Sequence, residues 1–334
     1  MSKIKIVLDA ISTDGNLEEI VKGAFKCVDF NKNLILYLVG PETEINPIIE
    51  KNNLKNENII LVNATDKITN EDVPTYAIRK KVESSLYKCF QLLKENDDIN
   101  GLVSAGATGA ILCGSIMILK PINNCRPALS TLLPMQNGEF FCLIDCGANV
   151  DCNASQLVDY ARLGSVYMET LYPERDIKVG LASNGSEDGK GNILTKEVFQ
   201  LLKQTDLNFV GNIEGNDILS GKCDVLVCDG FIGNIILKNI EGTAKTIIKD
   251  LFMMIKKSDD EQEKLYLQQA IERLLIKYDF NSRGGATLLG VNKVIMKGHG
   301  SANGDTIFHV VNKTYQLLEN DIIEKLNSKT NNAI

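Results

Sequence analysis

The sequence is poor in histidine and lacks the short motifs that mark several common enzyme classes. His299 and His309 are its only histidines, and residues ten positions apart on a helix face different sides, which disfavours a histidine-based zinc site. The segment "LDAISTDGN", after the first expected strand, lacks the GxGxxG spacing of a dinucleotide-binding loop. No GxSxG pentapeptide occurs. These absences disfavour metal-dependent hydrolases, classical NAD-binding enzymes and serine hydrolases.

Basic tracts, paired cysteines and long apolar runs are also missing. A net charge of -7 argues against a nucleic-acid-binding protein, which needs a basic face to neutralise phosphates. The nine cysteines include no CxxC pair and no secretory signal follows Met1, so we expect free thiols in a reducing cytosol. The longest apolar run, "AILCGSIMIL" at 110–119, is about half of the roughly 18 residues that cross a membrane. It predicts a buried core helix, and a membrane role would have to be at the surface.

Short β-branched runs alternate with longer helical patterns along the chain. The runs are apolar on both faces, which is typical of a parallel sheet covered by helices. They lie at 4–8, 34–40, 58–64, 101–106, 140–147, 177–183, 224–230 and 293–298. The expected helices include 16–30, 75–95, 154–170 and 302–325. This alternation predicts a doubly wound α/β fold, and we expect 1–334 to form a single catalytic unit.

One region breaks this alternation. Between Thr243 and Arg283 there is neither glycine nor proline, and two amphipathic patterns flank the charged stretch "KKSDDEQEK". They predict an amphipathic helical hairpin over 240–280. Its apolar stripe can pack on the core, or it can project towards a partner subunit or a membrane surface.

Five expected strands are followed by loops rich in small and polar residues. In an α/β sheet ligands bind at the carboxyl ends of strands, and glycine lets backbone N–H groups approach a ligand closely. The loops read "SAGATGA", "DCGANVD", "SNGSEDGKGN", "CDGFIGN" and "GHGSANGD". Five such loops at one sheet edge predict a site rich in backbone donors that holds an anion.

Lys190 stands between two glycines in the third of these loops. Its ammonium group can neutralise a phosphate or an oxyanion, although a lysine between glycines is commonly a solvated turn residue. Cys146 and Cys228 near strand ends could carry an acyl group, but small buried thiols that pack the sheet edge explain them better. A bound phosphate could itself attack an activated carbonyl, so that the protein has only to position it.

Taken together, the loops resemble a known family. The blocks "VSAGATGA", "RPAL", "LIDCGANVDC", "EDGKGN", "GNIEGNDILSGKCDVLVCDGFIGN", "GGATLLGV" and "HGSA" are similar to those of the bacterial acyl-acyl carrier protein:phosphate acyltransferases of phospholipid synthesis. The resemblance implies a three-layer α/β/α fold with a mostly parallel sheet, related to phosphate acetyltransferase. It also implies conversion of a long-chain acyl carrier protein thioester and inorganic phosphate into acyl phosphate, without a cofactor or metal.

The resemblance further implies site residues and partners. The catalytic residues would be Lys190 and Asn234. The substrate-binding residues would be Asp9, Gly106, Thr108, Gly109, Arg126, Asn149, Asp151, Asn192, Asp229, Gly233, His299 and Ser301. The expected partners are acyl carrier protein, phosphate, a second copy of the chain, the cytoplasmic face of the cell membrane and glycerol-3-phosphate acyltransferase, with no nucleic acid. The hairpin would serve the dimer, the membrane or both.

This chain departs from the family pattern in two loops. Ser12 and Thr13 replace two glycines of the first loop, and Ala107 stands where the family has asparagine. Three other functions therefore stay open. They are a short-chain acyl-CoA phosphotransferase, a catalytically weakened membrane-associated scaffold and, more distantly, a dehydrogenase of related fold.

Overall fold

The computed structural model describes residues 3–278 and 285–330. The chain divides into two compact units: the first takes 1–131, 162–176 and 281–334, and the second takes 132–161 and 177–280. The expectation of one catalytic unit concerns how the two act together and stays a prediction.

The first unit contains a largely parallel sheet. Its strands are β1 (Ile4–Asp9), β2 (Leu34–Gly40), β3 (Ile59–Asn63), β4 (Ile99–Ser104), β10 (Ala286–Leu289) and β11 (Val294–Lys297). The strand order is β3-β2-β1-β4-β11-β10, and the first half of β5 (Ala128–Pro134) follows beside β10. β10 runs antiparallel to β11 and β5, whereas the other neighbouring strands are parallel.

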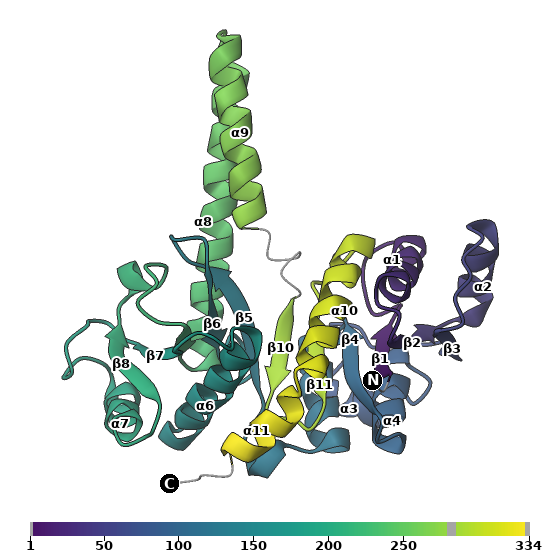
Figure 1. The fold of residues 1–334 in the computed structure, drawn as a ribbon, viewed down its shortest axis with the longest axis horizontal. Helices are drawn as coiled ribbons and strands as arrows, with labels where there is room; N and C mark the ends of the chain where they lie inside the picture. Colours follow the sequence, from purple (N-terminus) through teal and green to yellow (C-terminus); the bar gives the residue numbers. More distant parts are fainter. Residues whose placement is uncertain (1–2, 279–284, 331–334) are drawn as a thin grey trace. The chain divides into compact units, whose positions relative to one another are not determined.

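Helices cover both faces of this sheet, as Figure 1 shows. They are α1 (Leu17–Phe30), α2 (Glu42–Lys51), α3 (Pro74–Lys80), α4 (Ser85–Glu95), α5 (Thr108–Gly114), α10 (Gly304–Glu319) and α11 (Ile322–Thr330). α1 packs on α10, which contacts β1, β4 and β11, and α4 contacts β1, β2 and β4. The side chains of Ile6, Val7 and Leu8 on β1 are fully buried, which explains why this strand is apolar on both faces.

The second unit contains four parallel strands and a long hairpin of helices. Its strands are β6 (Phe140–Ile144), β7 (Lys178–Ala182), β8 (Asn208–Ile213) and β9 (Val225–Val227), in the order β6-β9-β7-β8. Its helices are α7 (Ile193–Leu202), α8 (Gly230–Lys257) and α9 (Glu261–Lys277), and α6 (Ala154–Leu171) crosses the boundary between the units. Parallel pairing brings the loops after β6, β7 and β9 to one edge of this sheet.

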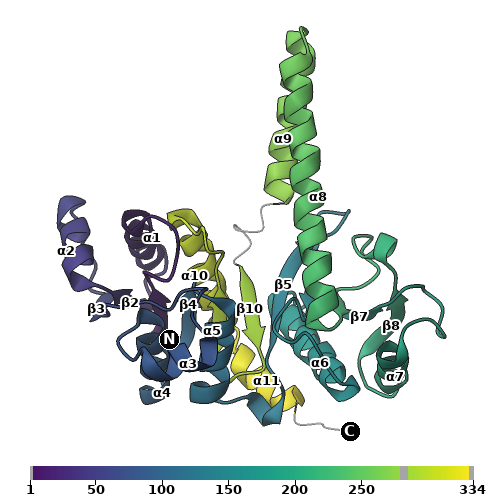
Figure 2. The same ribbon diagram turned by 180° about the vertical axis from the view of Figure 1, so that it is seen from behind.

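The helical hairpin is confirmed, with an earlier start than the predicted 240–280. α8 and α9 lie side by side and extend beyond the strands of the second unit (Figure 2). α8 begins at Gly230, so the segment "CDGFIGN" is mostly its first turn rather than a loop. The last two predicted hairpin residues lie outside the described ones. Within the described ranges, none of the helices is long and apolar enough to span a bilayer.

The α/β fold is confirmed, but several expected elements differ. The helix expected at 75–95 is two helices, because Ser84 caps α4 and starts it anew. The helix expected at 302–325 breaks at Asp321, where φ is +54°. The run 110–119 continues α5 as a π-helical turn and is only partly buried, with Met117 exposed. β5, β8 and β10 were not predicted.

Candidate functional site

The predicted site residues belong to two different units. Lys190, Asn234, Asn149, Asp151, Asn192, Asp229 and Gly233 are in the second unit, and Asp9, Gly106, Thr108, Gly109, Arg126, His299 and Ser301 are in the first. Most of these residues lie just after a parallel strand, in a loop or in the first turn of the following helix, at the sheet edge expected to bind ligands. Arg126 instead precedes β5.

Asp145, immediately after β6, organises the loop that follows it. Its side chain is fully buried. The carboxylate accepts hydrogen bonds from the backbone N–H groups of Gly147 (3.1 Å), Ala148 (3.0 Å) and Asn149 (2.7 Å). It also accepts one from the side-chain amide of Asn149 (2.9 Å). Asn149 is buried and supports this loop, and its contact with a substrate stays a prediction.

The start of α8 packs tightly against the same loop. The carboxylate of Asp229 caps the helix by accepting a hydrogen bond of 2.8 Å from an N–H of the first turn. Gly230 donates its N–H to the carbonyl oxygen of Asn149 at 2.7 Å. A Cβ atom on Gly233 would lie 1.9 Å from the carbonyl oxygen of Asp145. Glycine is therefore required where α8 meets the loop, and Asp229 fixes where the helix begins.

Asn234 follows directly and is exposed. Its side chain lies beside Gly147, where a Cβ atom would be 3.6 Å from the amide oxygen of Asn234. Gly147 has a φ of +130°, a conformation that other residues rarely adopt. The amide of Asn234 thus faces a position that carries no side chain, which leaves the amide accessible to a ligand.

The loop 183–192 after β7 presents Lys190. The N–H of Gly191 donates to the side-chain oxygen of Asn184 (2.8 Å), and the amide of Asn212 donates to the carbonyl oxygen of Glu187 (2.9 Å). The backbone N–H of Lys190 donates to the same carbonyl (3.0 Å). These bonds fix the backbone on both sides of the lysine.

The ammonium group of Lys190 has no ion-pair partner in the part of the chain that the structure describes. Its side chain is exposed, and no acidic residue within the described ranges lies at ion-pair distance from it. A Cβ atom on Gly185 would lie 2.8 Å from Cγ of Lys190, whereas one on Gly189 would meet nothing within 4 Å. Gly185, rather than Gly189, therefore makes room for the lysine side chain. Asn192 caps α7 by accepting the N–H of Thr195 at 2.8 Å.

In the first unit, Asp9 links two loops. Its side chain is 1% exposed. It accepts hydrogen bonds from the hydroxyl of Ser104 (2.8 Å) and the N–H of Ser12 (3.3 Å). The hydroxyl of Ser104 accepts the N–H of Gly106 at 3.1 Å. Asp9 therefore ties the loop after β1 to the loop after β4.

Thr13 fastens the first loop to the loop that precedes α10. Its hydroxyl donates to the carbonyl oxygen of Gly300 (2.8 Å) and accepts the N–H of Gly15 (3.0 Å). In the same loop, Nδ1 of His299 and the hydroxyl of Ser301 are 2.8 Å apart, and both residues are exposed. The hydroxyl that replaces an expected glycine thus forms contacts that glycine cannot form.

The remaining predicted residues lie at the start of α5 and in two loops. Thr108 and Gly109 are the first residues of α5, and Ala107 precedes them without a side-chain cap. Arg126 and Asp151 are exposed, each in its own unit. Their roles in substrate binding stay predictions.

The expectation that the glycine-rich loops point backbone N–H groups at a ligand is wrong for much of the site. The N–H groups of Gly106, Gly147, Ala148, Asn149 and Gly191 already donate to side chains of their own loops. Lys190 and Asn234 are side-chain donors that none of these contacts occupies, and their role in holding an anion stays a prediction.

Cysteine chemistry is disfavoured by burial. The thiols of Cys146 and Cys228 are buried, and burial raises the pKa of both well above the ordinary value. A thiol that stays protonated is a poor nucleophile. Among the described residues, no cluster of three histidine, cysteine or acidic side chains could hold a metal ion.

The sequence did not predict the roles of four residues that support the site loops. Asp145 forms hydrogen bonds within the loop after β6, and Asn184 and Asn212 form them with the loop after β7. Gly185 leaves space for the side chain of Lys190. An aspartate directly before a glycine-containing loop is a known turn former, which could have indicated Asp145. Gly185 and Asn212 act through contacts in space, and no local pattern marks them.

Comparison with known proteins gives a consistent picture. The family model described as "Fatty acid synthesis protein" matches residues 4–325. The chain is 40% identical over 327 residues to a phosphate acyltransferase of Clostridium novyi (strain NT), covering 97% of this chain and 98% of that protein. It is 38% identical over 321 residues to a phosphate acyltransferase of Bacillus pumilus (strain SAFR-032), covering 96% and 95%.

Two solved structures are similar in fold. One is a phosphotransacetylase from Streptococcus pyogenes, with a TM-score of 0.63 and 17% identity over 96% of this chain and 94% of that chain. The other is a branched-chain phosphotransacylase from Enterococcus faecalis V583, with a TM-score of 0.59 and 15% identity over 94% and 98%. At this identity the likeness concerns the fold alone.

Proposed function

Since this chain belongs to the phosphate acyltransferase family, we propose that it transfers a long-chain acyl group from acyl carrier protein to inorganic phosphate. The product is an acyl phosphate for phospholipid synthesis. The observation that carries this proposal is the exposed ammonium of Lys190, which has no ion-pair partner among residues 3–278 and 285–330 and lies on the same sheet edge as the accessible amide of Asn234.

The reaction needs an anion holder and an oxyanion stabiliser. A phosphate oxygen attacks the thioester carbonyl carbon, and the tetrahedral intermediate collapses with cleavage of the carbon–sulfur bond. An acyl–oxygen bond forms, and the carrier leaves as a thiolate that takes up a proton. Lys190 neutralises phosphate or the developing oxyanion, and Asn234 donates its amide to the same charge. Neither residue forms a covalent bond to the acyl group.

The rigid surroundings of both residues support this assignment. Charge stabilisation is effective only when the donors are held in place before the reaction. The four hydrogen bonds to Asp145 and the close contact at Gly233 fix the loop beside Asn234. The hydrogen bond that Asn184 accepts and the one that Asn212 donates fix the loop of Lys190.

A direct assay tests the proposal. Purified protein is incubated with palmitoyl-acyl carrier protein and radiolabelled phosphate, and the labelled acyl phosphate that forms and the carrier thiol that is released are both counted. We expect both products in equal amounts and only when phosphate is present. Thiol release that is independent of phosphate would indicate a hydrolase and contradict the proposal.

A short-chain acyl-CoA phosphotransferase is the second candidate, because the similar solved structures include a phosphotransacetylase. The same assay with acetyl-CoA as donor separates the two. Faster turnover of acetyl-CoA than of palmitoyl-acyl carrier protein would favour this candidate. A folded protein that turns over neither donor would favour the scaffold function.

We also propose that the hairpin attaches the protein to the cytoplasmic face of the membrane and contributes to a homodimer. Phe252, Met253 and Met254 are exposed near the end of α8, and Lys256 and Lys257 follow them. Apolar side chains beside basic residues suit an anionic lipid surface. Sedimentation with phosphatidylglycerol vesicles tests attachment, and light scattering tests the dimer. The double change Phe252→Glu, Met253→Glu should abolish sedimentation; unchanged sedimentation would contradict attachment through this segment.

A further inference from the structure

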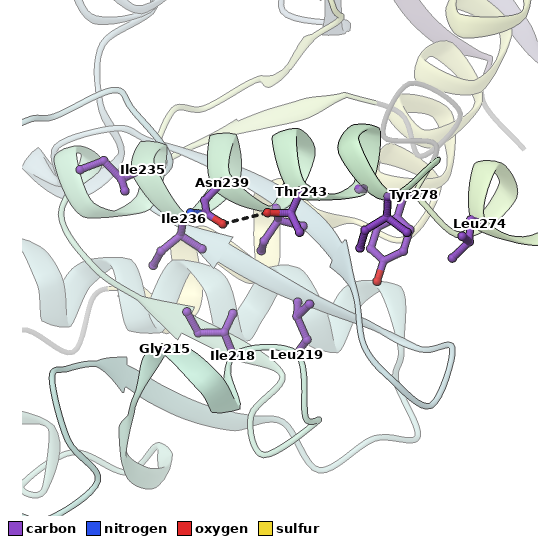
Figure 3. Close-up of a pocket in the computed structure, with 12 residues that line it drawn as sticks. Gly215, Ile218, Leu219, Ile235, Ile236, Asn239, Thr243, Leu274 and Tyr278 are labelled. Carbon is purple, nitrogen blue, oxygen red and sulfur yellow. Dashed lines mark hydrogen bonds between the residues drawn. The ribbon is translucent and has the colours of Figure 1, made fainter. Parts of the chain in front are cut away.

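The second unit contains an apolar pocket that none of the predicted site residues lines. Its volume is about 400 Å³, within the range of about 300–1,000 Å³ of small-molecule sites. One wall is a face of α8, and the opposite wall is the segment 215–219 that follows β8. Figure 3 shows Ile218 and Leu219 facing α8 across this pocket.

We propose that this pocket binds the acyl chain of the thioester substrate and sets its preferred length. The proposal rests on the proposed function, since it assumes an acyl thioester as substrate. It commits to the hydrocarbon chain as occupant because of the pocket's lining, its length and its position on α8.

The lining suits a hydrocarbon. Ile235, Ile240 and Ile247 from α8 contribute branched apolar side chains. The polar side chains of Asn239 and Thr243 are hydrogen-bonded to each other, with 3.2 Å between Oγ1 of Thr243 and Oδ1 of Asn239 (Figure 3). Part of their polar capacity is therefore satisfied within the wall, and burying a methylene chain against them costs little.

The length suits a long chain. Ile235 and Ile247 are twelve positions apart on α8, which corresponds to about 18 Å along a helix. A saturated chain advances roughly 1.25 Å per carbon, given the standard carbon–carbon bond length and a near-tetrahedral angle, so about 14 carbons span this distance. Tyr278 and Leu274 stand at the far end of the row (Figure 3), where they would limit how long a chain can enter.

The position suits a substrate held at the start of α8. Ile235 directly follows Asn234, so the pocket begins at the end of the helix that carries the proposed catalytic amide. The amide of Asn234 is directed at Gly147, whereas helical spacing places the pocket-lining residues on another face of α8. The proposal therefore puts the thioester at the N-terminal end of α8, with the amide on one side and the chain leaving along the other.

The test separates chain-length preference from chemistry. Acyl-carrier-protein substrates with chains of 4 to about 18 carbons are compared in wild type, Thr243→Phe and Tyr278→Ala. Thr243 is exposed and lines the pocket, so a ring there enters the cavity without displacing the core. Lys245→Phe is the matched control, since it adds the same ring to an exposed position of α8 outside the pocket.

We expect Thr243→Phe to lower kcat/KM for the palmitoyl substrate by roughly tenfold or more, because each excluded methylene loses its transfer free energy. Turnover of the butyryl substrate should stay within about twofold, and Lys245→Phe should match wild type at all lengths. Tyr278→Ala should shift the optimum to longer chains. Equal losses at all lengths, or an unchanged palmitoyl rate in Thr243→Phe, would overturn the proposal.

A binding measurement keeps this proposal distinct from the proposed function. Fluorescence of cis-parinaric acid, with palmitate as competitor, reports the pocket without turnover. Binding that Thr243→Phe abolishes and Lys245→Phe retains would support the pocket even if wild type transferred no acyl group. Conversely, turnover in wild type without parinaric acid binding, or a Thr243→Phe variant that changes only the oligomeric state, would overturn the pocket and leave the function intact.

Discussion

Replacing Asp145 by asparagine tests whether one buried carboxylate organises the loop beside Asn234. In the structure one carboxylate oxygen accepts the N–H groups of Gly147 and Ala148, and the other accepts the N–H and the side-chain amide of Asn149. An asparagine side chain has nearly the same shape but converts one oxygen into a donor. Two of these four donors would then lose their acceptor.

The expected cost follows from these two contacts. A hydrogen bond to a charged group contributes about 1.5–3 kcal/mol, so losing two lowers the free energy of unfolding by about 3–6 kcal/mol. The cost is at the upper end if Asn149 loses its acceptor, because Asn149 is buried. It is at the lower end for Gly147 and Ala148, which solvent reaches. The matched control is Asp151→Asn, an exposed aspartate a few residues further along, for which we expect a change within about 0.5 kcal/mol.

Urea unfolding followed by circular dichroism measures the loss, and hydrogen exchange reports it locally. The Asp145→Asn variant should unfold at roughly 1–2 M lower urea, with faster exchange at Gly147, Ala148 and Asn149. A loss below about 1 kcal/mol with unchanged exchange at these amides would refute the role assigned to the carboxylate.

Two further predictions concern the lysine loop and the thiols. Gly185→Ala should displace the side chain of Lys190 and lower kcat/KM for phosphate by roughly tenfold to a hundredfold. Gly189→Ala should leave kcat/KM unchanged, because its added methyl meets open space. Equal effects of the two substitutions would contradict the contact between position 185 and Lys190. Burial raises the pKa of the Cys146 thiol further than that of half-buried Cys152, so iodoacetamide near pH 8 should label Cys152 first in the native protein, as read by mass spectrometry. Earlier labelling of Cys146 would contradict the burial.

The parallel strands could be predicted because their apolar character is local. β1 and β2 are apolar on both faces because each has a neighbouring strand on both sides and helices packed on it. β8 was missed because it is an edge strand, and polar residues and a glycine interrupt the apolar residues of its sequence, "NFVGNI". β10 has only four residues. Its antiparallel pairing with β5 depends on partners distant in the sequence, which no local pattern reveals.

The sequence indicated the residue types of the candidate site but not their contacts. The pattern around Lys190 indicated a lysine held for chemistry, and its ammonium is unpaired within the part of the chain that the structure describes. The glycines of the site loops suggested free backbone donors, yet Asp145 already accepts the N–H of Gly147 and Asn184 that of Gly191. Which side chain accepts a hydrogen bond from which N–H depends on the folded loop. The sequence therefore shows the donors but not that they are already hydrogen-bonded.

The most direct test of the central claim compares wild type with Lys190→Ala, using Lys196→Ala as the control. Lys196 is an exposed lysine on α7, close in sequence and outside the loop. Phosphate-dependent release of carrier protein from palmitoyl-acyl carrier protein should fall by at least about a hundredfold in Lys190→Ala and stay unchanged in Lys196→Ala, with both proteins folded. Equal turnover in all three proteins would contradict the role of Lys190 and with it the site proposed here.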